Sequence, residues 1–301
     1  MAILPATRIT PDVAARSDTL RGQVGGIYRA ALYVELEPPS QLLVLAIDAV
    51  GGVPGGILVG GIADLRELGI DRGAELRPSA SGWSIPSAGV GIRTAGARTW
   101  SPGLPAAARA AATPELRFAL ELAREIAAHR APVGGLAPLL MAGERADDPW
   151  LAAARSLVAR QLLALAASDV AAAIDPTLDL IGLGTGLTPS GDDYLVGLLA
   201  ALEATADPLH RNLAAAIAHG IGGRTTAVGE ALIRHAVRGE FTERLHDVLI
   251  ALAAGRPRDL ARPIERAMAY GATSGSDTLV GLFSGLEIAI ARQAGDAEAA
   301  A

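Results

Sequence analysis

The chain has 301 residues, a net charge of −6 and no cysteine, so it can bury a sizeable core and has no general attraction to nucleic acid or anionic membranes. All 26 cationic side chains are arginines, which excludes a Schiff-base lysine, a pyridoxal phosphate anchor and a P-loop lysine. Positive charge for a ligand must therefore come from arginine, helix ends or a metal. No apolar run reaches signal-peptide or membrane-span length, so a soluble cytoplasmic protein is expected.

The first hundred or so residues predict short strands and turns. Their Val, Ile, Leu and Tyr residues stand between Pro-Pro, Gly-Gly and Pro-Gly breaks, a pattern typical of a sheet. The predicted strands lie within 23–36, 41–50, 56–62, 83–85 and 90–93. A short helix is predicted at 64–68 between the third and fourth of these segments.

From Thr113 onward the pattern becomes helical. Thr113 followed by Pro114 is typical of a helix start, and Phe118, Leu122 and Ile126 then share one face. The further helices are predicted at 149–167, 192–205, 208–219, 226–238, 242–254, 258–269 and 276–293. Several are apolar nearly all round, which predicts a central helix in a bundle. The expected fold class is α+β, with a β-rich region at 1–110 followed by a mostly helical region at 111–301.

A glycine- and hydroxyl-rich loop is repeated before two of the predicted helices. Residues 182–198 read GLGTGLTPSGDDYLVGL, and residues 271–282 read GATSGSDTLVGL. Aligning Ser190 with Ser274 also pairs Asp193 with Asp277 and aligns the Leu-Val-Gly-Leu strings. Helix N-termini present free backbone N–H groups and a positive dipole end to an anion. If the two helices converge, the loops form a ligand site.

Helix capping is the competing interpretation of both loops. Each contains an S-x-x-D string that could be a capping box. However, the three alternate glycines of 182–186 exceed what a cap needs, and Gly191 lies in a first turn, where glycine is a poor helix former. Asp192 and Asp193 add acidic groups to a site otherwise suited to an anion. That mixture suits phosphate with a divalent cation such as Mg²⁺, or a substrate that carries donor N–H groups.

A third helix start has similar chemistry. Arg224 could clamp an oxyanion beside two threonine hydroxyls, although a capping hydroxyl and a solvated arginine explain the pattern equally well. The five histidines show no metal-ligand spacing, so no set of metal ligands is predicted. The predicted catalytic residues are Asp192, Asp193 and Arg224. The predicted substrate- or anion-binding residues, all within the three loops, are Gly184, Thr185, Gly186, Thr188, Ser190, Gly191, Thr225, Thr226, Thr273, Ser274, Gly275 and Asp277.

The string G-x-G-x-G-L-T-P-S-G-D-D, intact from Gly182 to Asp193, resembles the AllH family, which was formerly a domain of unknown function. Residues 274–277 and 224–226 also look like that family, so the resemblance covers roughly 180–285. It implies one subunit of a multi-subunit oxamate carbamoyltransferase of allantoin degradation, a branch of purine catabolism. Such an enzyme converts oxalurate and phosphate into oxamate and carbamoyl phosphate. This transfer needs orientation and oxyanion stabilisation more than a covalent nucleophile, so the lack of lysine and cysteine is no obstacle.

Two other functions stay open at this point. The loop and its adjacent aspartates could hold ATP and Mg²⁺ in a phosphotransferase. Alternatively, the chain could be a non-catalytic scaffold or regulatory subunit of such a complex. The expected partners are a small anionic substrate, such as phosphate, carbamoyl phosphate or an oxamate-like compound, and other enzyme subunits. Nucleic acid and membrane are not expected as partners.

Overall fold

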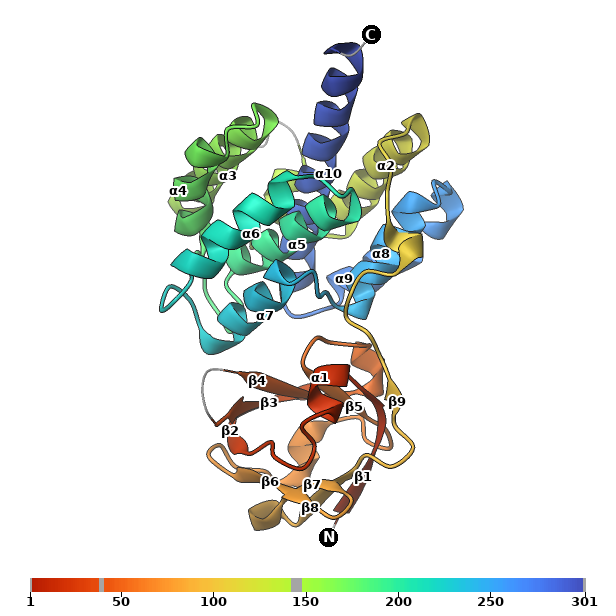
Figure 1. Cartoon of the computed structure of the whole chain (residues 1–301), viewed down its shortest axis with the longest axis vertical. Coiled ribbons are helices and arrows are strands. Elements are labelled where there is room, and N and C mark those ends of the chain that lie inside the picture. Colours follow the sequence, from red (N-terminus) through yellow and green to blue (C-terminus); the bar gives the residue numbers. More distant parts are fainter. Residues whose placement is uncertain (1, 38–40, 142–147, 300–301) are drawn as a thin grey trace. The chain divides into compact units, whose positions relative to one another are not determined.

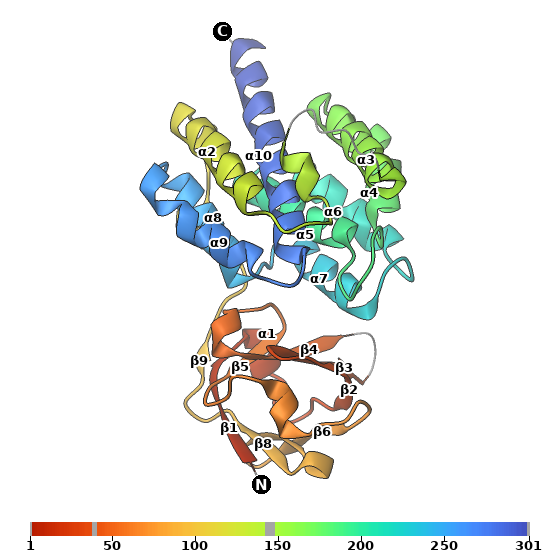
Figure 2. The same cartoon turned by 180° about the vertical axis from the view of Figure 1, so that it is seen from behind.

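The computed structural model describes residues 2–37, 41–141 and 148–299, with side chains described as far as Gln293. The chain divides into two compact units, Met1–Gly103 and Leu104–Ala301. The first unit contains the strands and the second contains the long helices (Figures 1 and 2), so the predicted α+β fold is confirmed. The two domains expected at 1–110 and 111–301 stay a prediction.

The N-terminal unit is a closed β-barrel. Its strands follow the order β5-β4-β3-β2-β6-β7-β8-β1, and β1 also pairs with β5, which closes the sheet. The ninth strand, β9, pairs in parallel with the end of β1. The strands are β1 (Ala2–Ile9), β2 (Gly22–Ile27), β3 (Ala31–Leu36), β4 (Leu42–Ile47), β5 (Gly56–Val59), β6 (Glu75–Ser79), β7 (Gly82–Ile85), β8 (Val90–Arg93) and β9 (Arg98–Thr99).

Alternating apolar residues build the core of the barrel. Leu32 and Val34 on β3 and Leu43 and Leu45 on β4 are buried at the two-residue spacing that places side chains on one face of a strand. Trp83 on β7 is also fully buried. A strand is found in each of the four segments predicted at 41–50, 56–62, 83–85 and 90–93. The segment predicted at 23–36 is a hairpin of two strands, β2 and β3, which pair antiparallel.

Two strands of the barrel, β1 and β6, have no counterpart in the sequence prediction. In β1, Pro5 and Arg8 interrupt the apolar alternation, so the segment does not read as a strand from its sequence. The tertiary pairing of β1 with β5 and β8 forms it instead. The short helix predicted at 64–68 is the 3₁₀ helix η2 (Leu65–Leu68), and the Asp64 carboxylate caps it by accepting from the Arg66 N–H at 3.0 Å.

The C-terminal unit is a bundle around one central helix. That helix, α5, is buried along almost its whole length and lies among the other helices in both views (Figures 1 and 2). The long helices are α2 (Pro114–Arg130), α3 (Pro149–Ala166), α4 (Val170–Leu180), α5 (Ser190–Ala204), α6 (Leu209–Gly220), α7 (Ala227–Val237), α8 (Glu243–Ala253), α9 (Ala261–Met268) and α10 (Ser274–Ala299). No helix in the described ranges is both long enough and apolar enough to cross a membrane.

Most of these helices are where the sequence predicts them. Thr113 caps α2 as expected, because its hydroxyl accepts from the Leu116 N–H at 3.2 Å. The exception is α4, which the sequence analysis did not predict. Pro176 lies inside this helix and disrupts its pattern, while the Asp169 side chain caps its start by accepting from the Ala172 N–H at 2.9 Å.

Helices α5 and α10 contact each other through their backbones. A Cβ atom on Gly197 would lie 1.9 Å from the Thr278 carbonyl oxygen, and one on Gly281 would lie 1.9 Å from the Tyr194 carbonyl oxygen. Gly197 and Gly281 are equivalent in the repeated motif, and so are Tyr194 and Thr278. The contact is therefore reciprocal, so a local two-fold relation links the two helices. They run in the same direction with their first turns side by side.

Candidate functional site

The glycines of the 182–189 loop have left-handed backbones that the loop itself requires. Gly182, Gly184 and Gly186 have φ values of 78°, 120° and 100°. A Cβ on Gly182 would lie 2.1 Å from the Arg224 carbonyl oxygen, and one on Gly184 would lie 2.8 Å from the Ser190 nitrogen. Among the described residues, none has an atom within 4 Å of the corresponding position on Gly186. Two of the three glycines therefore serve the packing of the chain, and Gly186 alone faces open space.

The first turn of α5 is not a capping box. Pro189 occupies the N-cap position with no side-chain cap, and Ser190 is already helical. The N–H of Gly191 donates to the Leu183 carbonyl at 2.8 Å, and the N–H groups of Asp192 and Asp193 donate to the Pro189 carbonyl at 2.9 and 3.2 Å. The helix start therefore offers fewer free N–H groups to an anion than the sequence suggested, and the aspartate side chains point to other partners.

Asp192 ties the loop to the start of α7. Its Oδ1 accepts from the Gly182 N–H at 2.7 Å, and its Oδ2 accepts from the Thr225 hydroxyl. Gly229 on α7 leaves room for this contact, since a Cβ there would lie 2.1 Å from Oδ2. Burial raises the pKa of Asp192, and these two hydrogen bonds oppose the rise. Both carboxylate oxygens are engaged, which suits a positioning role.

Asp193 and Asp277 form a second, reciprocal arrangement where α5 and α10 begin. Asp193 accepts a hydrogen bond from the Ser274 hydroxyl of the other helix, and Asp277 accepts one from the Ser190 hydroxyl. Both pairs are equivalent in the repeated motif, so they follow the same local two-fold relation as the glycine contacts. A further hydroxyl, from Thr188, reaches Asp193 and lies 2.8 Å from the Ser274 hydroxyl. The repeat thus brings the two carboxyl groups together, and they are called the carboxyl pair below.

The carboxyl pair is buried and only partly satisfied. The exposed fractions are 4% for Asp193 and 0% for Asp277. On each residue, Oδ2 is buried without a hydrogen-bond partner among the described residues. Burial, followed by the negative charge of Asp277, raises the pKa of Asp193 well above its usual range. Burial also raises the pKa of Asp277. The pair thus has free acceptor capacity and a strong tendency to hold a proton.

A short segment before η5 (Ala137–Leu140) covers Asp277. The Leu136 N–H donates to Asp277 Oδ1 at 2.6 Å, and a Cβ on Gly135 would lie 2.4 Å from the same oxygen. Gly135 also has a φ of 59°, so both its backbone conformation and the nearby carboxyl oxygen exclude a side chain there. Neither Gly135 nor Leu136 was among the site residues predicted from the sequence. The Gly134-Gly135 pair was the available signal, but nothing in the sequence connects this segment with Asp277, which lies 141 residues after Leu136.

Arg224 and the two threonines beside it occupy a neighbouring position. Thr226 caps α7 by accepting from the Gly229 N–H at 2.9 Å, and its hydroxyl donates to the Leu187 carbonyl at 2.6 Å. Arg224 is exposed, and its guanidinium donates to the Leu178 carbonyl at 3.4 Å. The Arg224 backbone therefore lies against the loop at Gly182. Its side chain donates to a carbonyl of α4 and not to the carboxyl pair.

The remaining predicted residues fall into two groups. Thr185 and Gly186 are exposed at the tip of the loop. Gly275 is buried at the start of α10, where a Cβ would lie 2.0 Å from the Ala267 carbonyl oxygen, so its role there is close packing. Thr273 precedes α10, and its hydroxyl bonds to Asp277. The predicted residues thus surround the starts of α5, α7 and α10, and their deepest point is the carboxyl pair.

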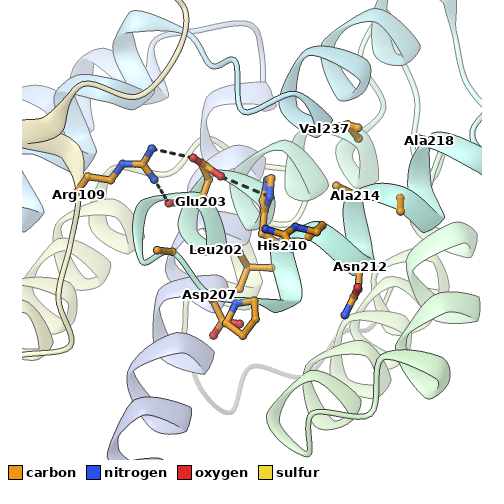
Figure 3. Close-up of a pocket in the computed structure, with 13 residues that line it drawn as sticks. Arg109, Leu202, Glu203, Asp207, His210, Asn212, Ala214, Ala218 and Val237 are labelled. Atoms are coloured by element: carbon orange, nitrogen blue, oxygen red, sulfur yellow. Dashed lines mark hydrogen bonds and ion pairs between the residues drawn. The ribbon is translucent and has the colours of Figure 1, made fainter.

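A separate cleft of about 750 Å³ lies at the opposite end of α5 (Figure 3). Its charged centre is Glu203, which pairs with the Arg109 guanidinium at 2.9 Å and lies 3.5 Å from His210 Nδ1. Burial lowers the pKa of His210. Glu203 lies ten residues after Asp193 on α5, so about 15 Å along the helix axis separate this cleft from the carboxyl pair. The sequence analysis treated His210 as an ordinary helix residue, and no motif marks the cleft.

The described residues contain no group of three or more histidine or acidic side chains that could hold a metal ion. The Mg²⁺ considered from the sequence would therefore need ligands from a bound substrate. Phosphate oxygens commonly complete a magnesium site in this way.

Comparison with known proteins bears directly on this region. Residues 180–286 match the model of the family described as "Oxamate carbamoyltransferase subunit AllH". The resemblance to this family is confirmed over that segment, which runs from the end of α4 into α10. The segment includes the three loops, the carboxyl pair and the α5–α10 contact, and it excludes the barrel. No solved structure matches the chain.

Proposed function

We propose that this chain is a subunit of a carbamoyltransferase that acts on oxamate, oxalurate or a related ureido compound, and that its site is the carboxyl pair with the loops around it. The family match over residues 180–286 supports the reaction class. One observation supports this location: where α5 and α10 begin, Oδ2 of Asp193 and Oδ2 of Asp277 are buried and have no hydrogen-bond partner among the described residues.

The chemistry of the pair suits a carbamoyl or ureido group. Such a group carries N–H donors, and a buried carboxyl oxygen without a partner gains most by accepting one. The neighbouring hydroxyls of Thr188 and Ser274 add groups that both donate and accept. In a water-excluded site these interactions orient the substrate and act strongly on the charge that develops during transfer.

The phosphate would bind on the exposed side of the same loop. Gly186 has open space around it, so the backbone can approach a ligand closely there. Thr185 is exposed beside it, and Arg224 offers an exposed guanidinium suited to bidentate contact with phosphate. This placement keeps the charged phosphate oxygens on the side of Arg224 and solvent, with only the attacking oxygen turned toward the buried carboxyl pair.

Calorimetry on the full chain tests this proposal. Carbamoyl phosphate, phosphate and oxamate are titrated separately, with and without the partner subunits. We expect Arg224→Ala to weaken phosphate binding at least tenfold, which corresponds to about 1.4 kcal/mol. Asp193→Asn should weaken oxamate or carbamoyl phosphate binding, whereas the exposed Asp175→Asn serves as the matched control and should change neither. No binding of any of the three compounds, alone or in the complex, would contradict the proposal.

The phosphotransferase alternative makes a different prediction. A chain that binds ATP with Mg²⁺ is stabilised by that ligand through mass action, so its melting temperature rises with ligand concentration. Stabilisation by Mg-ATP, without any by carbamoyl phosphate, would favour the alternative. Transferase activity of the partner subunits without this chain would favour a scaffold or regulatory role instead.

A further inference from the structure

We propose that Asp193 and Asp277 share one proton at neutral pH and act together as a proton relay for carbamoyl transfer. The reaction assigned to the pair rests on the proposed function above. The proton count is a property of the folded chain alone, so the two parts of the proposal can be tested separately.

The first argument is geometrical. The two carboxyl groups stand at equivalent positions of a repeat, and each accepts from the serine hydroxyl that begins the other helix. Both are more than nine-tenths buried, and each retains one oxygen without a partner among the described residues. A local two-fold relation of this kind gives two acids in matched surroundings. Either one can carry the proton while the other stays ionised.

The second argument is electrostatic. The charged groups that act on Asp193 are Asp277 and Asp192, and both are acidic. The groups that reach the pair from the 132–136 segment and from the loops are neutral donors: the Leu136 N–H and the hydroxyls of Ser and Thr residues. Two buried carboxylates side by side repel each other, and one retained proton removes that repulsion.

Asp192 does not enter this arrangement as a proton carrier. Burial raises its pKa, but both of its oxygens accept hydrogen bonds, from the Gly182 N–H and the Thr225 hydroxyl, and these bonds oppose that rise. Its charge adds to the field that keeps a proton on the neighbouring pair. The acidic Asp192-Asp193 dipeptide thus contains one positioning residue and one member of the relay.

A pair with one proton matches the proton balance of the proposed reaction. A phosphate oxygen forms a bond to the ureido carbonyl carbon, and the bond from that carbon to the amide nitrogen breaks. The electron pair of the broken bond stays on the leaving nitrogen, which takes a proton from the neutral carboxyl group. The ionised carboxylate accepts the proton that hydrogen phosphate loses. The pair therefore ends with one proton, as it began, and the two residues have exchanged roles.

The proton count is measured on the full chain with ¹³C-labelled aspartate carboxyl groups followed by NMR through a pH titration. We expect one of the two carboxyl groups to stay protonated at neutral pH. In Asp277→Asn, the remaining Asp193 should titrate at lower pH than in the wild type, because the neighbouring charge is gone. Asp175→Asn should leave the titration unchanged. Titration of both groups together in the ordinary aspartate range would overturn the proposal, and so would an upward shift of Asp193 in Asp277→Asn.

The relay is measured on the assembled complex. Asp193→Asn and Asp277→Asn should each lower kcat at least 100-fold with little change in the KM for phosphate, and should remove one limb of a bell-shaped pH profile. Phosphate binding by the variants should persist, which separates this result from misfolding. Normal kcat in both variants overturns the relay. Absence of transferase activity in the wild-type complex overturns the proposed function instead, while the NMR titration still decides the proton count. Displacement of the shared proton by added Mg²⁺ would identify a cation site and refute the relay.

Discussion

The glycine contact between α5 and α10 gives the sharpest test of the packing. In Gly281→Ala, the new Cβ would lie 1.9 Å from the Tyr194 carbonyl oxygen. An ordinary carbon–oxygen contact needs roughly 3.4 Å, so the helices must separate by about 1.5 Å. The obstructing atom belongs to the backbone and has no rotamer to change. The cost should therefore lie near the upper end of the usual range for overpacking, at about 3 kcal/mol.

A smaller effect opposes this cost, because alanine favours a helix over glycine by about 1 kcal/mol. We therefore expect Gly281→Ala to lower the free energy of unfolding by about 2 kcal/mol. For a unit of this size, that change lowers the melting temperature by roughly 4–8 °C. Urea unfolding followed by far-ultraviolet circular dichroism measures it, since the helical signal arises mainly from the C-terminal unit. The midpoint should shift while the slope stays the same.

Gly222→Ala is the matched control. No atom in the described part of the chain lies within 4 Å of the position where its Cβ would be, and its backbone is not left-handed. Its effect on the free energy of unfolding should be within about 0.5 kcal/mol. The reasoning fails if Gly281→Ala is as stable as Gly222→Ala, because the helices would then not touch through their backbones. The equivalent Gly197→Ala should behave like Gly281→Ala, since the contact is reciprocal.

Three further outcomes are expected. Asp193 has a raised pKa in the folded chain, so its stabilising contribution is complete below about pH 4 and declines as pH rises through that raised value. Asp193→Asn should therefore gain stability relative to the wild type between pH 5 and pH 8 in urea unfolding, and a constant difference would contradict this sign. Tyr194→Phe removes the hydroxyl that donates to the buried Gln161 Oε1 at 2.9 Å, so the free energy of unfolding should fall by about 1–2 kcal/mol in the same assay. An unchanged free energy of unfolding would mean that this hydrogen bond does not stabilise the fold. Asp192→Asn should speed amide hydrogen exchange at Gly182 without changing the exchange of α10 amides. Equal protection of the Gly182 amide in the variant and the wild type would argue against the hydrogen bond from Gly182 to Asp192.

The sequence predicted the elements whose signals are local. Thr113 and Pro114 mark the start of α2, and the repeated Ser-Gly-x-Asp strings mark two loops that the fold places side by side. Aligning the repeat made Asp193 and Asp277 equivalent positions, but only the fold shows that their carboxyl groups lie together. By contrast, α4 was missed because Pro176 interrupts its pattern, and β1 was missed because only its barrel neighbours make it a strand.

The finer organisation of the candidate site depends on tertiary contacts that no local pattern encodes. The capping interpretation treated Ser190 as an N-cap, but the preceding Pro189 takes that position, so the helix starts at Ser190, one residue earlier than that interpretation implies. Asp192 and Asp193 look alike in the sequence, yet they lie on different faces of α5 and contact different segments. The N–H donor of Leu136 comes from a segment about 140 residues away from Asp277, so only the folded chain reveals it.

The closure of the barrel by β1 and β5 limits how the N-terminal unit can bind another protein. Proteins with an open sheet can recruit a partner by adding its strand to an exposed edge. Here the hydrogen-bonding groups of β5, which would otherwise be an edge, are taken up by residues 6–9 of β1. A partner subunit that binds this unit would therefore have to recognise side chains and loops. Substitutions of its surface side chains would then strengthen or weaken the binding of such a partner, whereas the strand backbone would not contribute.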